Sequence, residues 1–432
     1  MQKFLTGRDQ LFKPINFDSM RSFYLGLFLL FGLLLVEVSC QLLWMQVFPP
    51  GLISWLYFFS GLGIGSVMFW TPSFLKVNFT IQHYSSIFFF LLLLMVLYIF
   101  RHSEFAIHRN PLNYQVADML PVIKIMGERC LNGHQIYSII PEIWGGMQPI
   151  YLPAMWLSYL PAVALQVDLR WISLIVMGLG LILPYFFIPQ RSKVSFWLIL
   201  YLVPSFMALD HLLTVDSVFF SASEEAVVVF YYLLLGASLL TRRYTLQAFF
   251  ITLCLLSRFS LLGWVPVYLV YIYMHAGWPV LRRVLVVLLS TCLGLMTLTG
   301  AIFHLDIWLG IQKNYLAALM AQPWKYRELI DVNLGLAKLW QYEALPIMHY
   351  LSVVLCLFIL PLVFIYFLIR KFSFTAHPLF ILGALKIILV VFYNLLIMPY
   401  GYLFYTSTFL SVIIFIAYTA NLTPTSSTAN NN

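Results

Sequence analysis

Long apolar runs, separated by short polar segments, dominate the sequence. Four of these runs extend from Phe23 to Trp44, Val284 to Phe303, Tyr350 to Ile369 and Tyr402 to Tyr418. A helix of about 20 apolar residues is long enough to cross the hydrocarbon core of a bilayer. Unbroken runs of this length differ from the alternating ten-residue segments that build outer-membrane barrels. The pattern therefore predicts an all-α fold, a polytopic transmembrane helical bundle.

Proline, glycine and charged residues mark the ends of the predicted membrane spans. About twelve spans result, near 22–46, 51–70, 84–100, 169–189, 194–213, 225–241, a broken pair within 244–281, 284–303, 346–369, 377–398 and 401–419. Residues 150–166 are also apolar, but their prolines and aromatic residues favour a re-entrant or interfacial segment. A short ordinary span there, with an inverted second half of the chain, is the alternative.

Composition and charge agree with a membrane protein. The chain is 62% hydrophobic and 9% charged, which excludes a water-soluble enzyme. The net charge of +8 comes from basic residues between the spans, and it reports topology. With a cytoplasmic N-terminus, the short loops rich in Lys and Arg fall on the cytoplasmic side, including those with Arg191, Arg242, Arg282 and Arg370. Most acidic residues fall on the outer face, where we expect the polar chemistry.

Two basic residues interrupt apolar stretches, where a charge costs at least a few kcal/mol. Lys386 is interpreted as snorkelling toward the cytoplasmic interface. Arg258 is expected at an outer turn, where its guanidinium could clamp an anionic headgroup; a structural pair with a neighbouring carboxylate or carbonyl is the alternative. Glu224 and Glu225 open a span at the outer edge. They are interpreted either as acids that complement the helix dipole or as part of a carboxylate cluster.

Familiar soluble-enzyme motifs are missing from the sequence. There is no Walker loop, HExxH or GxSxG, and the five cysteines have no metal or redox spacing. Gly61 and Gly65 match the small-xxx-small pattern of closely packed membrane helices. Two outer loops, 101–149 and 304–345, mix charged and aromatic residues, so we expect short amphipathic surface helices over a cavity.

One stretch of the first outer loop resembles a known family signature. It runs from Asp118 through Gly127, Asn132-Gly133, Tyr137, Pro149, Tyr151 and Pro153 to Pro161. It is similar to the first loop of the GT-C superfamily of integral-membrane glycosyltransferases, and the resemblance extends to Glu224-Glu225 and to Arg258 with Pro266. The resemblance implies a mannosyltransferase-like enzyme. Such an enzyme transfers a sugar from a polyprenyl-phosphate donor to an acceptor hydroxyl at the outer face, with inversion.

Carried over by position, the resemblance makes Asp118 the catalytic base. The implied substrate-binding residues are Glu224, Glu225, Arg258, His134, Tyr137, Tyr151, Tyr400 and Tyr402. Arg258 or a bound metal would offset charge that grows on the departing phosphate. Glu224 and Glu225 are adjacent, unlike the spaced acids of metal-using members. No metal ligand and no cofactor are therefore assigned, and a divalent metal is left open.

The resemblance also implies how the chain is organised. Residues 1–83 would be a cytoplasmic segment with two additional spans, 84–300 the catalytic core, 301–345 the second long outer loop, 346–420 the C-terminal spans and 421–432 a disordered tail. The expected partners are a lipid-linked sugar donor, a glycan or lipid acceptor and membrane lipid, without nucleic acid. A bacterial inner (plasma) membrane is the expected location, with the endoplasmic reticulum as the alternative.

Two other function classes remain open at this point. One is a polytopic transporter or flippase, and the other is a lipid-linked polysaccharide polymerase or ligase.

Overall fold

The described part of the chain is helical. The computed structural model describes residues 17–43, 50–69, 84–109, 112, 119–143, 145–187, 199–307, 334–340, 342–370, 372, 375, 377–396 and 401–420. Within these ranges there is no named strand, and one isolated antiparallel bridge joins Ile140 to Met147. The predicted all-α class is therefore confirmed for the described residues.

The helices follow the apolar runs closely. Their bounds are α1 Phe17–Leu43, α2 Pro50–Val67, α3 Tyr84–Arg109, α4 Met119–Leu131, α5 Pro153–Leu157, α6 Leu160–Ala164, α7 Arg170–Phe187, α9 Leu202–Thr214, α10 Val218–Ser221, α11 Glu225–Leu239, α12 Tyr244–Leu255, α13 Trp264–Ala276, α14 Trp278–Leu298, α17 Leu345–Val354, α18 Leu360–Ile369, α19 Pro378–Leu395 and α20 Phe404–Ala420. Short 3-10 turns include η1 (Phe259–Leu261) between α12 and α13. A π-helical turn, Leu355–Ile359, joins α17 to α18.

Six described helical segments are long and apolar enough to cross a membrane. They are Tyr24–Leu42, Ser86–Phe105, Trp278–Leu298, Leu345–Ile369, Pro378–Leu395 and Gly401–Thr419. Shorter apolar helical segments lie in α2, α7, α9, α11 and α12. The chain is thus a multi-pass membrane protein. The predicted number of about twelve crossings goes beyond these six.

The peripheral and central helices differ in how much of their apolar surface is exposed. The segment Gly401–Thr419 is almost entirely buried, whereas little of Trp278–Leu298 is covered. Side chains such as Phe90 and Phe100 on α3 and Leu289 and Leu293 on α14 are more than half exposed. Apolar side chains at this exposure fit contact with lipid tails, so α3 and α14 lie at the lipid boundary.

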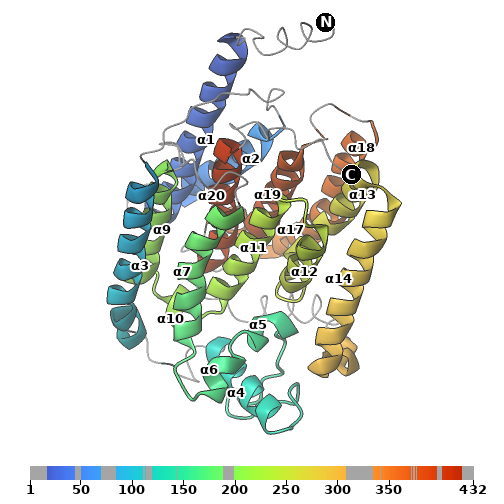
Figure 1. Ribbon diagram of the computed structural model, residues 1–432. Coiled ribbons are helices and arrows are strands. Elements are labelled where there is room, and N and C mark those ends of the chain that lie inside the picture. The colour runs from blue at the N-terminus through green and yellow to red at the C-terminus, as the bar shows by residue number, and fades with distance from the viewer. Residues whose placement is uncertain are drawn as a thin grey trace, which may run out of the picture.

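Residues 150–166 do not form a membrane-crossing helix. They contain two helices of five residues, α5 and α6, each only about 7.5 Å long. Together with α4 these helices lie at one end of the bundle, the lower end in Figure 1. The Ala154 N–H donates to the Leu256 carbonyl at 3.0 Å, and the Leu120 N–H donates to the Ala222 carbonyl at 3.3 Å. The prediction of a non-crossing segment is confirmed.

Glycine residues bring α2 and α19 into close contact. A Cβ atom at Gly383 would lie 2.6 Å from the Gly65 carbonyl oxygen, and one at Gly61 would lie 2.6 Å from a Val390 methyl. Neither position has room for a side chain, because Gly383 faces backbone and Gly61 faces the Val390 side chain. The prediction that Gly61 and Gly65 serve helix packing is confirmed.

Candidate functional site

A charged cluster of Arg258, Glu224 and Glu225 lies at the end of the bundle covered by α4, α5 and α6. Arg258 Nη2 donates to Glu224 Oε1 at 2.7 Å and also to Glu225 Oε1. The two carboxylates are at most 1% exposed, whereas the arginine side chain is 27% exposed. One side of the guanidinium therefore faces buried carboxylates, and part of the group stays accessible.

Local structure explains how the three side chains meet. Glu224 is the N-cap of α11, and Glu225 is its first residue. Arg258 follows the end of α12 in an extended conformation, with φ −148° and ψ 140°, and its N–H donates to the Cys254 carbonyl at 2.9 Å. The carboxylate pairing that the sequence left as the alternative for Arg258 is therefore present. The headgroup clamp remains a prediction.

The cluster is unbalanced in charge. Two ionised carboxylates facing one guanidinium leave a net charge of about −1 in a buried setting, which is costly without a further proton, cation or hydrogen-bond donor. Glu224 Oε2, Glu225 Oε2 and Arg258 Nε have no hydrogen-bond partner among the described residues. All three atoms are buried, so the cluster contains unused hydrogen-bonding capacity of both kinds, one donor and two acceptors.

Tyrosine side chains and the start of α4 surround the cluster. Tyr151 and Tyr402 lie close enough to Arg258 to interact electrostatically with its guanidinium, as does Tyr393 of α19. The Tyr402 hydroxyl also donates to the Met119 sulfur at 3.3 Å. Because the next residue, Leu120, is hydrogen-bonded to Ala222, the first turn of α4 adjoins the segment that leads to Glu224.

The remaining predicted residues fall at different distances from the cluster. Tyr137 is buried, and its hydroxyl donates to the Tyr151 carbonyl at 3.3 Å; burial raises the pKa of that hydroxyl to about 12, so it stays neutral. His134 is exposed in the turn after α4, and no described contact brings it to the cluster. Asp118 and Tyr400 lie outside the described residues.

A divalent metal would find two carboxylates at this site. Among the described residues, no group of three or more His, Cys, Asp and Glu side chains could hold a metal ion. Glu224 Oε2 and Glu225 Oε2 are the oxygen atoms here that hydrogen bonds leave unused. They could accept from ligand hydroxyls as readily as they could coordinate a cation.

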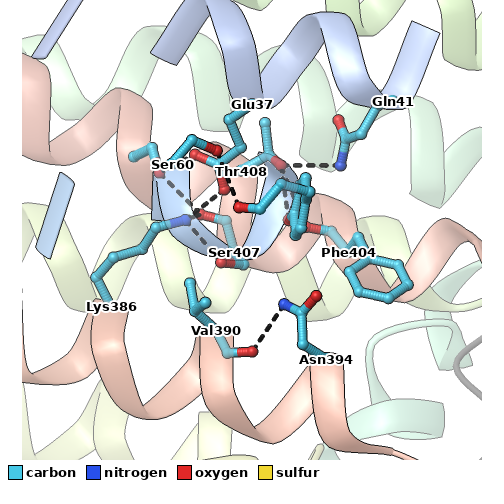
Figure 2. Close-up of polar contacts among 11 residues, drawn as sticks. Glu37, Gln41, Ser60, Lys386, Val390, Asn394, Phe404, Ser407 and Thr408 are labelled. Atoms are coloured by element: carbon cyan, nitrogen blue, oxygen red, sulfur yellow. Dashed lines mark hydrogen bonds and ion pairs between the residues drawn. The ribbon is translucent and has the colours of Figure 1, made fainter. Parts of the chain in front are cut away.

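A second charged cluster lies within the bundle, between α1, α19 and α20. Figure 2 shows Lys386 pointing toward Glu37 and Ser407. Lys386 Nζ lies 2.5 Å from Glu37 Oε1 and donates to the Ser407 hydroxyl at 2.7 Å and to its carbonyl at 2.9 Å. The Ser411 hydroxyl donates to Glu37 Oε2 at 2.6 Å. Both charged side chains are 0% exposed.

The interpretation of Lys386 as a snorkelling side chain is therefore wrong. Its ammonium does not reach an interface, because a carboxylate and two serine oxygens bind it inside the bundle. A sequence signal was present, since Glu37 and Lys386 are charges of opposite sign that each interrupt an apolar span. Intramembrane charges usually pair with one another, a rule that favours a buried partner for Lys386 without identifying which one.

The fold and the two clusters define a class, a helical multi-pass membrane protein with paired charges among its buried residues. No known protein family, no curated protein and no solved structure matches this chain.

Proposed function

We propose that this protein is a membrane glycosyltransferase. It transfers a sugar from a polyprenyl-phosphate donor to an acceptor hydroxyl at the outer face, with inversion. A GT-C arrangement of about twelve spans and a bacterial inner membrane are part of the proposal. The observation that supports it best is the convergence of Arg258, Glu224, Glu225, Tyr151 and Tyr402 at one end of the bundle. These five residues come from distant parts of the chain, and the resemblance implies a substrate-binding role for each of them.

The donor phosphate would bind the accessible part of Arg258. The carboxylates use Nη2 and Nε is buried, so the N–H groups of Nη1 would donate to phosphate oxygens. Charge-assisted hydrogen bonds of this kind are stronger than neutral ones. Glu224 Oε2 and Glu225 Oε2 would accept from sugar hydroxyls. Such hydroxyls would satisfy the two carboxylate oxygens that the described residues leave without a partner in the cluster.

Sugar transfer needs one proton acceptor. In the proposed reaction the acceptor oxygen forms a bond to the anomeric carbon as the bond from that carbon to the phosphate oxygen breaks. The polyprenyl phosphate leaves with the bonding electron pair, and the acceptor proton passes to the Asp118 carboxylate. Asp118 directly precedes Met119, whose sulfur accepts a hydrogen bond from Tyr402.

The test is a transfer assay with purified protein and a panel of labelled polyprenyl-phosphate sugars, with and without chelator. We expect Asp118→Asn to reduce transfer at least about 100-fold, the usual contribution of a general base. Asp306→Asn makes the same chemical change at an exposed position of the second outer loop and should keep full activity. Full activity in Asp118→Asn with normal membrane insertion would remove the assigned base.

Glu224→Gln provides the second arm of the test. It keeps the shape of the side chain and removes one charge, so we expect weaker donor binding and retained folding. Glu142→Gln, at an exposed position, is the matched control. The length of the product separates single transfer from a polymerase or ligase, since those enzymes yield a ladder or a joined polymer.

A transporter or flippase is the second candidate, favoured by the buried Glu37–Lys386 pair. Intramembrane charges mark ion or substrate pathways in many transporters, and this pair lies among polar groups of α1 and α20. Uptake or lipid scrambling by the purified protein in vesicles, lost in the double variant that combines Glu37→Gln with Lys386→Met, would support this candidate. Absence of such activity in a preparation that transfers sugar would exclude it.

A further inference from the structure

A polar cavity of about 370 Å³ lies at the other end of α11 from the charged cluster. Its main lining residues are Arg242, Tyr244, Gln247, Tyr268, Tyr271 and His275, with Pro378 and Ile381 of α19 among the others. The 15 residues of α11 separate Glu225 from this cavity, a length of about 22 Å. The cavity is therefore distinct from the candidate site, and its volume is in the range of small-molecule sites.

The lining side chains meet one another within the cavity. The Tyr268 hydroxyl donates to Gln247 Oε1 at 2.6 Å, and Gln247 Nε2 donates to the Ser238 and Thr241 carbonyls at 3.1 and 2.7 Å. Gln247 thus fixes the turn between α11 and α12. Tyr271 interacts electrostatically with Tyr244 and with Arg242, so these three groups face a common space.

Hydrogen-bond donors in the cavity are left unused. Arg242 forms no ion pair with any described residue, and no carboxylate is among the described lining residues. The Tyr244 and Tyr271 hydroxyls make no described hydrogen bond. His275 Nδ1 donates to the Tyr271 carbonyl at 3.1 Å, so the neutral ring offers only an acceptor at Nε2. One cation and two hydroxyls are the groups here that fit an anion.

Basic residues continue around the cavity. Arg242 and Arg243 are both exposed, and Arg282 and Arg283 lie in the first turns of α14, shortly after the α13 residues that line the cavity. A surface of one sign raises the local concentration of anions. Basic clusters at a membrane edge also attract anionic headgroups, at about 1 kcal/mol for each residue.

We infer that this cavity binds a phosphate group, carried either by an anionic lipid or by a soluble phosphate compound. Arg242 makes charge-assisted hydrogen bonds to the phosphate oxygens, and the Tyr244 and Tyr271 hydroxyls donate to the same group. The inference does not depend on the proposed glycosyltransferase activity, because no residue of the cavity belongs to the charged cluster.

The test measures binding to the purified full chain. Inorganic phosphate is titrated against protein in neutral detergent, with chloride at equal ionic strength as the control. In a second arm, native mass spectrometry counts phosphatidylglycerol and phosphatidylcholine molecules retained from equimolar mixtures. We expect binding of phosphate, or selective retention of phosphatidylglycerol. Phosphatidylglycerol retention identifies a lipid headgroup, and phosphate binding without lipid preference identifies a soluble ligand.

Two arginine variants decide whether the cavity is responsible. Arg242→Gln should weaken binding of the effective probe about tenfold, which corresponds to about 1.4 kcal/mol. Arg101→Gln removes the same charge at an exposed position of α3, outside the cavity lining, and should bind as the unmodified protein does. The inference is overturned if neither probe binds, if Arg242→Gln binds normally, or if both variants lose affinity equally. Tyr271→Phe, which keeps the ring, should produce a smaller loss.

Discussion

The ammonium group of Lys386 is held by three oxygen atoms, one from Glu37 and two from Ser407. No water can replace Glu37 at this position, because both side chains are fully buried. Removing one partner would leave the other charge buried without compensation. Replacing both partners would leave no buried charge, and the remaining cost would come only from imperfect packing. The cost of a single substitution therefore exceeds the net contribution of the pair.

Lys386→Met is predicted to lower the free energy of unfolding by about 3–5 kcal/mol. The combination of Glu37→Gln with Lys386→Met should recover a large part of that loss, because the buried charge is gone. Thermal unfolding of the purified proteins in detergent measures both. Lys124→Met is the matched control, since Lys124 pairs with Glu128 at 3.9 Å while 42% exposed, and it should change stability by less than about 1 kcal/mol. A double variant as unstable as Lys386→Met would contradict the prediction.

Asp216 gives the fold a pH dependence. Burial raises the pKa of this carboxyl from 3.8 to about 6, so the folded chain holds the proton more tightly than the unfolded chain does. The stabilising effect of the proton is complete below about pH 4 and is lost as the pH rises through about 6. Because the side chain keeps some exposure, Asp216→Asn should stabilise the fold by only about 1–2 kcal/mol at pH 7.5. Unfolding temperatures at pH 4.5 and 7.5 check this, and an equal gain at both values would contradict it.

At the scale of the helices, the close crossing of α2 with α19 depends on glycine residues, which have no side chain to separate the two backbones. A Cβ atom at Gly383 would lie 2.6 Å from a backbone oxygen of Gly65 and 2.9 Å from the Met68 Cβ. Backbone cannot yield as a flexible side chain does, so an added methyl must push the helices apart. The same crossing lies one turn from Lys386, which connects the packing of α2 to the buried ion pair.

Gly383→Ala is predicted to destabilise the protein by about 1–3 kcal/mol, the usual cost of overpacking. Gly294 on α14 is the matched control, because an added Cβ there would meet nothing within 4 Å. Gly294→Ala should be neutral or stabilising by up to about 1 kcal/mol, since alanine favours the helix more than glycine does. Unfolding temperatures of both variants would test the contrast, and equal effects would show that the crossing tolerates a side chain.

The sequence predicted the helices well because apolar length and helix-breaking residues act locally. The break between α12 and α13, the two short helices α5 and α6, and the start of α11 at Glu225 follow from prolines, glycines and charges near each position. Partners in space could not be predicted in the same way. Glu224 meets Arg258 across 34 positions and Glu37 meets Lys386 across 349, and such pairings depend on how whole helices pack.

At the scale of the whole molecule, the two ends of the bundle carry different chemistry. The helices α4, α5 and α6 lie at one end (Figure 1), and backbone hydrogen bonds join this end to the segments beside the charged cluster. The phosphate-binding cavity lies at the opposite end of α11. Both α11 and α12 run between the two places, since α11 begins at Glu225 and α12 ends three residues before Arg258. If basic loops face the cytoplasm, the two ends contact different compartments.

Cysteine labelling tests this orientation. In a variant without native cysteines, Leu131→Cys places a thiol at the exposed last residue of α4, and Arg243→Cys places one between α11 and α12. A membrane-impermeant maleimide should label Leu131→Cys in intact cells and Arg243→Cys only after permeabilisation. Neither substitution replaces a residue of the charged cluster or of the cavity lining. Labelling of both from the same side would contradict the predicted topology.

The distance in sequence between Glu37 and Lys386 has a consequence for synthesis. Glu37 leaves the ribosome 349 residues before its cation, which at about 5–20 residues per second corresponds to roughly 20–70 s. During that interval the first helix carries a carboxyl group without the cation that pairs with it in the folded protein. Only when α19 and α20 arrive can α1 take its final position, which makes the last helices of the chain the step that completes assembly of the first.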